Sequence, residues 1–403
     1  MKFLSCLLMF CLSSPTWAGP NLDLSGNVEG QVRHTSNNSE AQDDLFQDWE
    51  EENFYLFYGN LNGKLEKDNS RIEANWFLRY SQSKLYDPKP TIFGERDPYF
   101  VTTIFTFPSQ LVARDMFKLQ YKRQDGDHQI ESILNKFYYE HDSDKYRFML
   151  GRMYVNYGLG EIFNPVNPFN QPTGLTSISQ VAQGNDGASI TYFLSDTHTI
   201  QFLLLGDKSI NDYEGKIDST VWAHGEYQYS DQLQLDYVIG EDQNRYKLGG
   251  QISYRLEEAM VFSQLLYRSE TSGNKPSHNL WDLLLGYDQQ LSGKWHIRFE
   301  SGYQKQNRYM ALNNFGERFL PTEYFGALAN VYEFHPLFKA SGTIINDLKS
   351  GFTYFIAKGT YDLGNSMEAE LFGFTPVSKG DDTDNVAQKL VTTDVGLALR
   401  AFF

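Results

Sequence analysis

The sequence predicts an all-β fold, a closed antiparallel transmembrane β-barrel of about 18 to 20 strands with a loop partly plugging its lumen. Apolar and polar residues alternate with period two along most of the 403 residues, as in a wall between lipid and water. Aromatic residues make up 15% of the chain, yet its mean hydropathy is only -0.48. Beyond the amino-terminus, no stretch approaches the roughly 20 consecutive apolar residues that a membrane helix needs.

The amino-terminus has the pattern of a cleaved signal peptide, residues 1–18. Lys2 supplies a positive charge, residues 3–12 are mostly apolar, and Thr16-Trp17-Ala18 offers small residues to a signal peptidase. Because Cys6 and Cys11 lie in this segment, we expect no disulfide, thiolate nucleophile or cysteine-bound metal in residues 19–403. Those residues are predicted to form one barrel domain without a cofactor or metal.

In the first half of the chain, alternating segments are separated by polar turns. Strands are expected over residues 21–32, 53–66, 71–80 and 116–124, with a short additional strand at 99–107. A long polar loop is expected between the first two strands. A hairpin is expected to join residues 129–140 to residues 146–157.

The second half alternates more regularly. We expect strands over residues 199–207, 221–229, 233–240, 245–256, 282–288, 295–300, 324–334, 340–346, 352–361 and 367–374. Bacterial barrels have an even number of strands, and the weakest segments leave the total between about 18 and about 20.

The terminal segment, residues 391–403, divides cleanly into two faces. Val395, Leu397, Leu399, Ala401 and Phe403 share one face, while polar and small residues occupy the other. This segment resembles the last strand of bacterial outer-membrane barrels, whose final phenylalanine belongs to the signal read by the barrel-insertion machinery. The resemblance implies that Phe403 is an insertion signal. It also implies a location in the outer membrane of a Gram-negative bacterium, with the membrane lipid and that machinery as partners.

Residues 151–170 interrupt the alternation with a conspicuous motif. It consists of Gly151-Arg152, then Gly158 and Gly160, then Asn164-Pro165 and Phe169-Asn170. The segment resembles a Gly-Arg…Gly-x-Gly…Asn-Pro…Phe-Asn motif of a family of largely uncharacterised, porin-like bacterial outer-membrane proteins. The resemblance implies a fold and a location rather than a substrate.

The same segment departs from that family at three positions. Met153, Tyr157 and Asn167 stand where Gln, Trp and Asp are usual. Its prolines force turns, because proline lacks an N–H and restricts the preceding residue. The apolar residues between these turns favour packing over disorder. We therefore expect residues 158–187 to form a plug loop that folds against other loops or into the lumen.

Inward-facing charges form a second candidate site. Candidates for lining or constricting the pore are Arg79, Arg152, Asp236, Arg245, Lys247, Arg255, Arg298 and Glu300. Opposed charges across a lumen can order polar solutes and set ion preference. They can equally pair with one another and stiffen the wall, and the sequence leaves both possibilities open.

Arg152 needs separate treatment because strict alternation would place it toward lipid, where a charge is costly. A bulge at Gly151 would turn it inward. Alternatively, it lies at the rim. Its expected role is either an ion pair that holds the loop or a part of the constriction.

These patterns predict a porin-like channel for passive diffusion of small hydrophilic solutes, with homo-oligomerisation left open. The net charge of -16 argues against a nucleic-acid partner. A gated transporter or exporter is an alternative, although the predicted inward faces are mostly polar. A barrel-embedded hydrolase is a weaker alternative. His224 and His296 face inward near carboxylates, but neither accompanies a nucleophile motif, so we expect no enzymatic activity.

Overall fold

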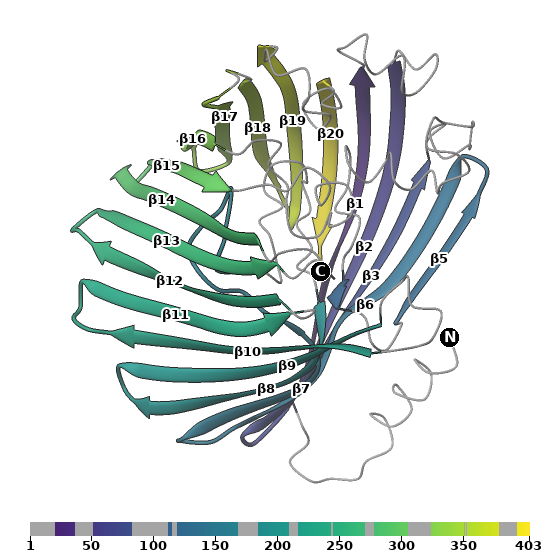
Figure 1. The fold of residues 1–403 in the computed structure, drawn as a ribbon. Helices are drawn as coiled ribbons and strands as arrows, with labels where there is room; N and C mark the ends of the chain where they lie inside the picture. The colour runs from purple at the N-terminus through teal and green to yellow at the C-terminus, as the bar shows by residue number, and fades with distance from the viewer. Residues whose placement is uncertain are drawn as a thin grey trace, which may run out of the picture.

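The computed structural model describes residues 21–36, 51–82, 112–114, 119–167, 184–208, 217–242, 245–270, 278–304, 324–349, 351, 353–378 and 393–403. They form a closed, antiparallel 18-strand β-barrel, visible in Figure 1 as a ring of strands. The predicted closed antiparallel β-barrel is therefore confirmed. None of the described residues belongs to a helix long and apolar enough to cross a membrane.

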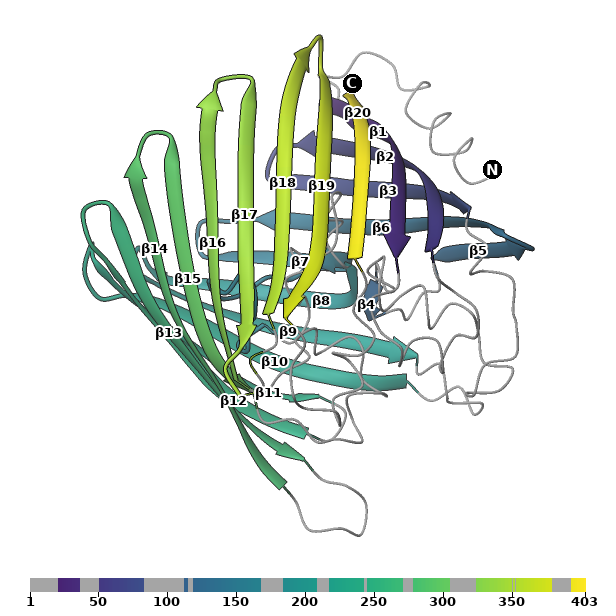
Figure 2. The ribbon, with the colours of Figure 1, turned by 90° about the horizontal axis from the view of Figure 1, so that it is seen from above.

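The wall follows the chain order. Its strands are β1 (Asn21–Ser36), β2 (Glu51–Lys67), β3 (Ser70–Gln82), β6 (His128–Asp142), β7 (Tyr146–Tyr154), β8 (Gly184–Ser195), β9 (His198–Lys208), β10 (Ile217–Gln228), β11 (Leu233–Asp242), β12 (Arg245–Arg255), β13 (Ala259–Glu270), β14 (His278–Ser292), β15 (Trp295–Gln304), β16 (Tyr324–His335), β17 (Phe338–Asp347), β18 (Thr353–Gly364), β19 (Met367–Ser378) and β20 (Thr393–Phe402). The β18–β19 turn and the carboxy-terminus lie at the same end of the barrel (Figure 2).

The barrel closes between β20 and β1. Their antiparallel register runs from Asn27 opposite Phe402 to Ser36 opposite Thr393. One step further, Gly26 and Phe403 exchange both backbone hydrogen bonds, at N–O distances of 2.9 and 3.0 Å. Closure pairs the backbone groups of the first and last strands, which would otherwise be exposed edges.

Alternation along each strand separates an outer apolar face from an inner face. In β20, Leu397 is 57% exposed, while Asp394 and Ala398 are 0% and 2% exposed. The outward residues of β1, Leu24 and Val32, are likewise exposed. A ring of exposed apolar side chains outside hydrogen-bonded strands is the pattern of a barrel wall in lipid.

The wall is interrupted between β6 and β8. β7 pairs with residues 137–142 of β6, whereas the short strand β5 (Gln120–Asp125) pairs with residues 128–133 on the same edge. A second short strand, β4 (Val112–Arg114), pairs in parallel with Gly184 and Asn185 of β8. Thus β5 continues the edge of β6 that β7 leaves, whereas β4 lies on the edge of β8 opposite β7. Neither adds a full strand to the wall.

Several sequence predictions differ from these bounds, and no strand was predicted where β13 lies. β7 ends at Tyr154, before the predicted end at residue 157, because the chain leaves the wall there. β8 begins at Gly184, inside the segment predicted to be a loop up to residue 187. The strand predicted at 116–124 begins at Gln120 within the described residues. The short strand predicted at 99–107 lies outside them.

Candidate functional site: a loop held on the inner wall

After β7, residues 155–167 leave the wall and pack on inward-facing side chains of later strands. Val155, Tyr157 and Val166 share a buried cluster with residues of β9 to β13, namely Leu203, Leu205, Trp222, Val238 and Leu266. Ile162 and Phe163 share a second cluster with Phe262, Leu284, Phe325, Ala327 and Ile345. The inner face of β9 to β17 therefore carries two apolar patches beneath the loop, which the sequence analysis did not anticipate.

A carboxylate on β15 holds the loop backbone. Glu300 accepts hydrogen bonds from the backbone N–H groups of Glu161, Ile162 and Phe163, at 2.8, 3.0 and 3.3 Å. Glu300 is 1% exposed. Three consecutive N–H groups converging on one carboxylate form an anion-binding backbone arrangement, and hydrogen bonds to a charged acceptor are stronger than neutral ones.

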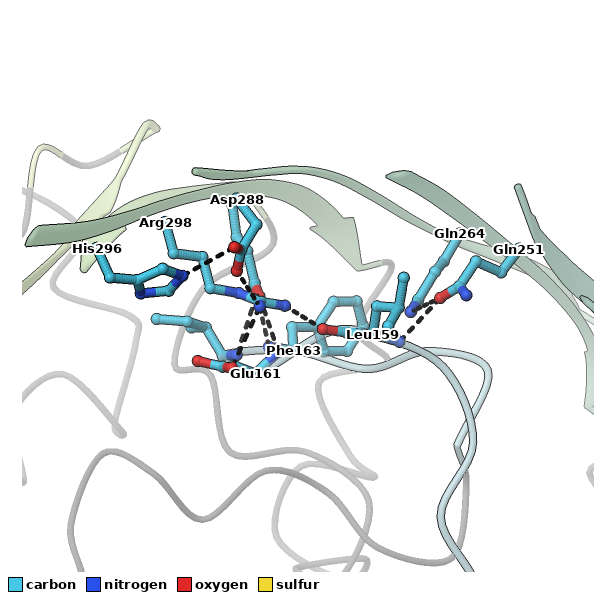
Figure 3. Close-up of polar contacts among 10 residues, drawn as sticks. Leu159, Glu161, Phe163, Gln251, Gln264, Asp288, His296 and Arg298 are labelled. Atoms are coloured by element: carbon cyan, nitrogen blue, oxygen red, sulfur yellow. Dashed lines mark hydrogen bonds and ion pairs between the residues drawn. The ribbon is translucent and has the colours of Figure 1, made fainter. Parts of the chain in front are cut away.

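Arg298 also joins the loop to the wall, and it bonds the same Glu300 carboxylate. Its Nε donates to Glu300 at 2.8 Å, and its Nη1 donates to Asp288 at 2.8 Å and to Glu161 at 3.1 Å. Its Nη2 donates to the carbonyl oxygen of Leu159. Figure 3 shows the guanidinium between the wall carboxylates and the loop backbone. One buried cation thus connects two strands and the loop.

Amide side chains extend this network along the wall. The backbone N–H of Leu159 donates to Gln251 Oε1 at 2.8 Å, and Gln264 Nε2 donates to the same oxygen at 2.7 Å. Gln251 Nε2 in turn donates to Asp236 at 2.7 Å. Leu159 is therefore fixed by its N–H to β12 and by its carbonyl oxygen to Arg298.

Tyr157 anchors the beginning of the loop. Its phenol donates to Gln201 Oε1 at 2.6 Å, and its ring stacks on His224 with centroids 4.1 Å apart. Burial raises the pKa of Tyr157 above its usual range, so the phenol stays protonated and remains a donor.

Gly158 and Gly160 of the motif lie so close to neighbouring atoms that no side chain would fit there. Gly158 has φ +71°, and a Cβ there would lie 2.5 Å from Val166 Cγ2. A Cβ at Gly160 would lie 1.9 Å from the carbonyl oxygen of Phe163. Asn164 Nδ2 closes the same turn by donating to the carbonyl oxygen of Tyr157 at 2.6 Å. Pro165 is buried in this turn, whereas Phe169 and Asn170 lie outside the described residues.

Arg152 lies at the point where β7 stops pairing with β6, which we call the fork. It forms a bidentate pair with Asp186 of β8, at 2.6 and 2.8 Å, and its Nη1 donates to the carbonyl oxygen of Leu134 in β6 at 3.1 Å. The register of β7 runs through Gly151 without a shift on either side, so the bulge considered there is absent. The bulge is instead in β6, between the pairs Asn75–Lys136 and Trp76–Leu134.

The remaining candidates occupy different environments. Arg79 bonds Glu131, and both are buried. Lys247 is 2% exposed and Asp236 is 9% exposed. Arg255 is exposed at the end of β12. The side chain of Arg245 lies outside the described residues. Of the predicted set, Asp236, Arg298 and Glu300 belong to the network that holds the loop.

Sequence reasoning missed several members of this site. Gln251 and Gln264 were not singled out, because an inward amide on a strand has no distinctive pattern. Asp186 was missed because it lies in a segment predicted to be a loop. The alternation did place Asp288 inward, but no sequence signal linked it to Arg298. Among the described residues, no group of three or more His, Cys, Asp or Glu side chains could hold a metal ion.

Comparison with known proteins gives a consistent answer on the fold. No protein-family model matches the chain, and no curated protein is significantly similar in sequence. Among solved structures, Acinetobacter baumannii OccAB4 aligns with a TM-score of 0.58 and 10% identity, covering 95% of this chain and 98% of that chain. The fold is that of a porin barrel.

Two further porins are similar over the same extent. A BenF-like porin from Pseudomonas fluorescens Pf-5 aligns with a TM-score of 0.57 and 8% identity, covering 95% of this chain and 98% of that chain. Pseudomonas aeruginosa OccK2, solved with glucuronate, aligns with a TM-score of 0.56 and 9% identity over the same shares. At such low identity, the likeness to these porins concerns the fold.

Proposed function

We propose that the protein is an outer-membrane, porin-like channel through which small hydrophilic solutes diffuse passively. The observation that supports this most is the loop at residues 155–167, which Glu300 and Arg298 hold on the inner side of a closed barrel. A loop fixed inside a barrel gives the lumen a defined shape. A narrowed lumen of defined shape is what a diffusion channel needs to admit solutes by size.

The accessible inward charges support a polar passage. The side chains of Glu161, in the loop, and of Glu226, on β10, are 65% and 54% exposed. On β3, β7 and β18, Arg71, Arg147 and Lys358 are 33%, 43% and 40% exposed. Opposed charges across a wet lumen set up a transverse field that orders polar solutes and influences ion preference.

Within this proposal, the buried candidates shape the passage instead of touching the solute. Arg298 and Glu300 fix the loop, and Arg152 with Asp186 fixes the fork from which the loop starts. Arg79 and Lys247 are buried in the wall, so we assign them to wall structure. The exposed carboxylates of Glu161 and Glu226 are the groups that we propose to meet the solute.

The route to the membrane is also a proposal. We infer that residues 1–18 are removed as a signal peptide and that Phe403 is read by the barrel-insertion machinery. The apolar outer residues of β20, which end on this aromatic residue, support the second inference.

Reconstitution in planar lipid bilayers tests the proposed function. Folded, purified protein should give discrete current steps that depend linearly on voltage. Folding should be checked beforehand by the shift in electrophoretic mobility on heating that hydrogen-bonded barrels show. Folded protein that gives no current step at any protein concentration would contradict a passive channel and favour the exporter or hydrolase alternatives.

A further inference from the structure

Four aromatic side chains on the inner face lie over a glycine of the neighbouring strand. The directly opposed pairs are Trp222–Gly240, Phe262–Gly286, Phe325–Gly302 and Phe372–Gly396. A Cβ on these glycines would lie 2.0, 2.0, 2.4 and 2.2 Å, respectively, from the nearest ring atom. Each ring therefore occupies space that any other residue would fill. We call these four glycines the glycine seats.

Two of the glycine seats, Gly286 and Gly302, lie beneath the part of the loop that contains Ile162 and Phe163. The ring of Phe325, over Gly302, meets Phe163 of the loop edge-on, with centroids 5.9 Å apart and planes at 89°. The ring of Phe262, over Gly286, lies 5.1 Å from the guanidinium carbon of Arg298. Phe262 and Phe325 belong to the same buried cluster as Ile162 and Phe163. These two rings form the floor on which the loop and its arginine rest.

We propose that Gly286 and Gly302 are positioning residues of the channel, which set the depth at which the loop projects into the lumen. This inference rests on the proposed function and adds to it the residues that fix the size limit for solutes. The glycines do not contact the loop themselves. They act through the rings of Phe262 and Phe325, which can lie close to the wall only where the facing residue has no side chain.

The expected displacement follows from van der Waals distances. Carbon atoms pack best at about 3.5 to 4.0 Å, so a methyl group at Gly302 would move the Phe325 ring by about 1 Å or more. Movement away from the wall brings the ring toward Phe163, which meets it edge-on. Because Glu300 also holds the N–H of Phe163 at 3.3 Å, the loop must either shift inward or lose these bonds.

Gly302→Ala is the first test, and Gly396→Ala is its matched control. Gly396 makes the same kind of contact, with Phe372, but that ring lies near Arg33 of β1, 5.4 Å from its guanidinium carbon. Among the described residues, Phe372 belongs to neither hydrophobic cluster that contains the loop. The control therefore retains the general cost of filling a glycine seat without the effect on the loop.

Two measurements decide the outcome. Single-channel conductance should fall in Gly302→Ala and Gly286→Ala, remain at the wild-type level in Gly396→Ala, and recover in the double variant Gly302→Ala/Phe325→Leu, whose smaller side chain relieves the contact. Hydrogen exchange of the amides at 161–163 should be faster in Gly302→Ala than in Gly396→Ala. Equal conductance and equal exchange in the two alanine variants would overturn the inference, as would a change that Phe325→Leu does not reverse.

The exchange measurement separates this inference from the proposed function. If the wild-type protein conducts nothing, the channel proposal fails, and with it the link to solute size. The amide exchange of residues 161–163 still reports whether Gly302 positions the loop, because it needs only folded protein in detergent or vesicles.

Discussion

Arg152 and Asp186 form a bidentate ion pair between β7 and β8, in which neither side chain has any exposed surface. The pair lies where β7 leaves the wall, and Arg152 also bonds the backbone of β6 at Leu134. Three strands therefore meet on one guanidinium. The loop that follows β7 takes its starting point from this fork.

Removing one partner of that pair should destabilise the barrel. Arg152→Met leaves the Asp186 carboxylate buried without its cation, and breaking a buried pair in this way costs about 3 to 5 kcal/mol. Denaturant unfolding of the folded barrel in detergent would measure the loss. The exposed pair of Arg123 and Asp125 provides a control, since Asp125→Asn should leave the unfolding midpoint nearly unchanged. Equal midpoints in the two variants would refute the structural role of Arg152.

Glu300→Gln should loosen the loop without unfolding the wall. The amide keeps one acceptor oxygen but loses the charge that attracts three backbone N–H groups and Arg298. We expect current traces with frequent transitions between levels, where the wild type gives a steady level. Glu226→Gln is the control, because that carboxylate is half-exposed and its ion-pair contact is with His224 of the wall. Steady traces in Glu300→Gln would show that the loop is held by other contacts.

Closure of the barrel should depend on Gly26. A Cβ there would lie 2.7 Å from the Phe403 ring and 2.4 Å from the carbonyl oxygen of Asn60, whereas a Cβ at Gly30 would meet nothing within 4 Å. Gly26→Val should therefore lower the folded yield, measured by the heat-dependent electrophoretic shift, while Gly30→Val should not. The two glycines lie on the same face of β1, so similar yields would contradict this account of closure.

Ion preference should respond to the exposed carboxylate of the loop. Glu161 is the charged residue of the described loop, and its side chain is 65% exposed. Glu161→Gln removes a negative charge beside the passage, so the preference for cations should decrease. The reversal potential under a salt gradient would register the change. An unchanged potential would place the ion pathway away from Glu161.

Local patterning predicted much of the wall. In β20, the alternation of Asp394 through Leu399 assigned both the strand and its two faces correctly, because neighbouring side chains in a strand point to opposite sides. In β6, the set of alternate residues that faces inward switches part-way along the strand, and this was harder to predict. It results from one extra residue, Asn135, which shifts the inward set from Gln129 and Glu131 to Tyr138 and Glu140.

The candidate site was predictable only in part. The Gly158 and Gly160 turn was visible in the sequence, as were the prolines that bend the chain. The side chains on which this turn packs could not be predicted, since Phe262 and Phe325 lie about a hundred or more residues away along the chain. Only the closure of the barrel brings them beneath Phe163, so local periodicity has no information about that contact.

Deleting residues 162–171 tests the central claim most directly. These residues include the loop segment that Glu300 holds against β15. If the loop narrows a water-filled barrel, the shortened protein should fold and give a larger single-channel conductance than the wild type in the same bilayer and salt. A folded deletion variant with the wild-type conductance, or with none, would contradict this account.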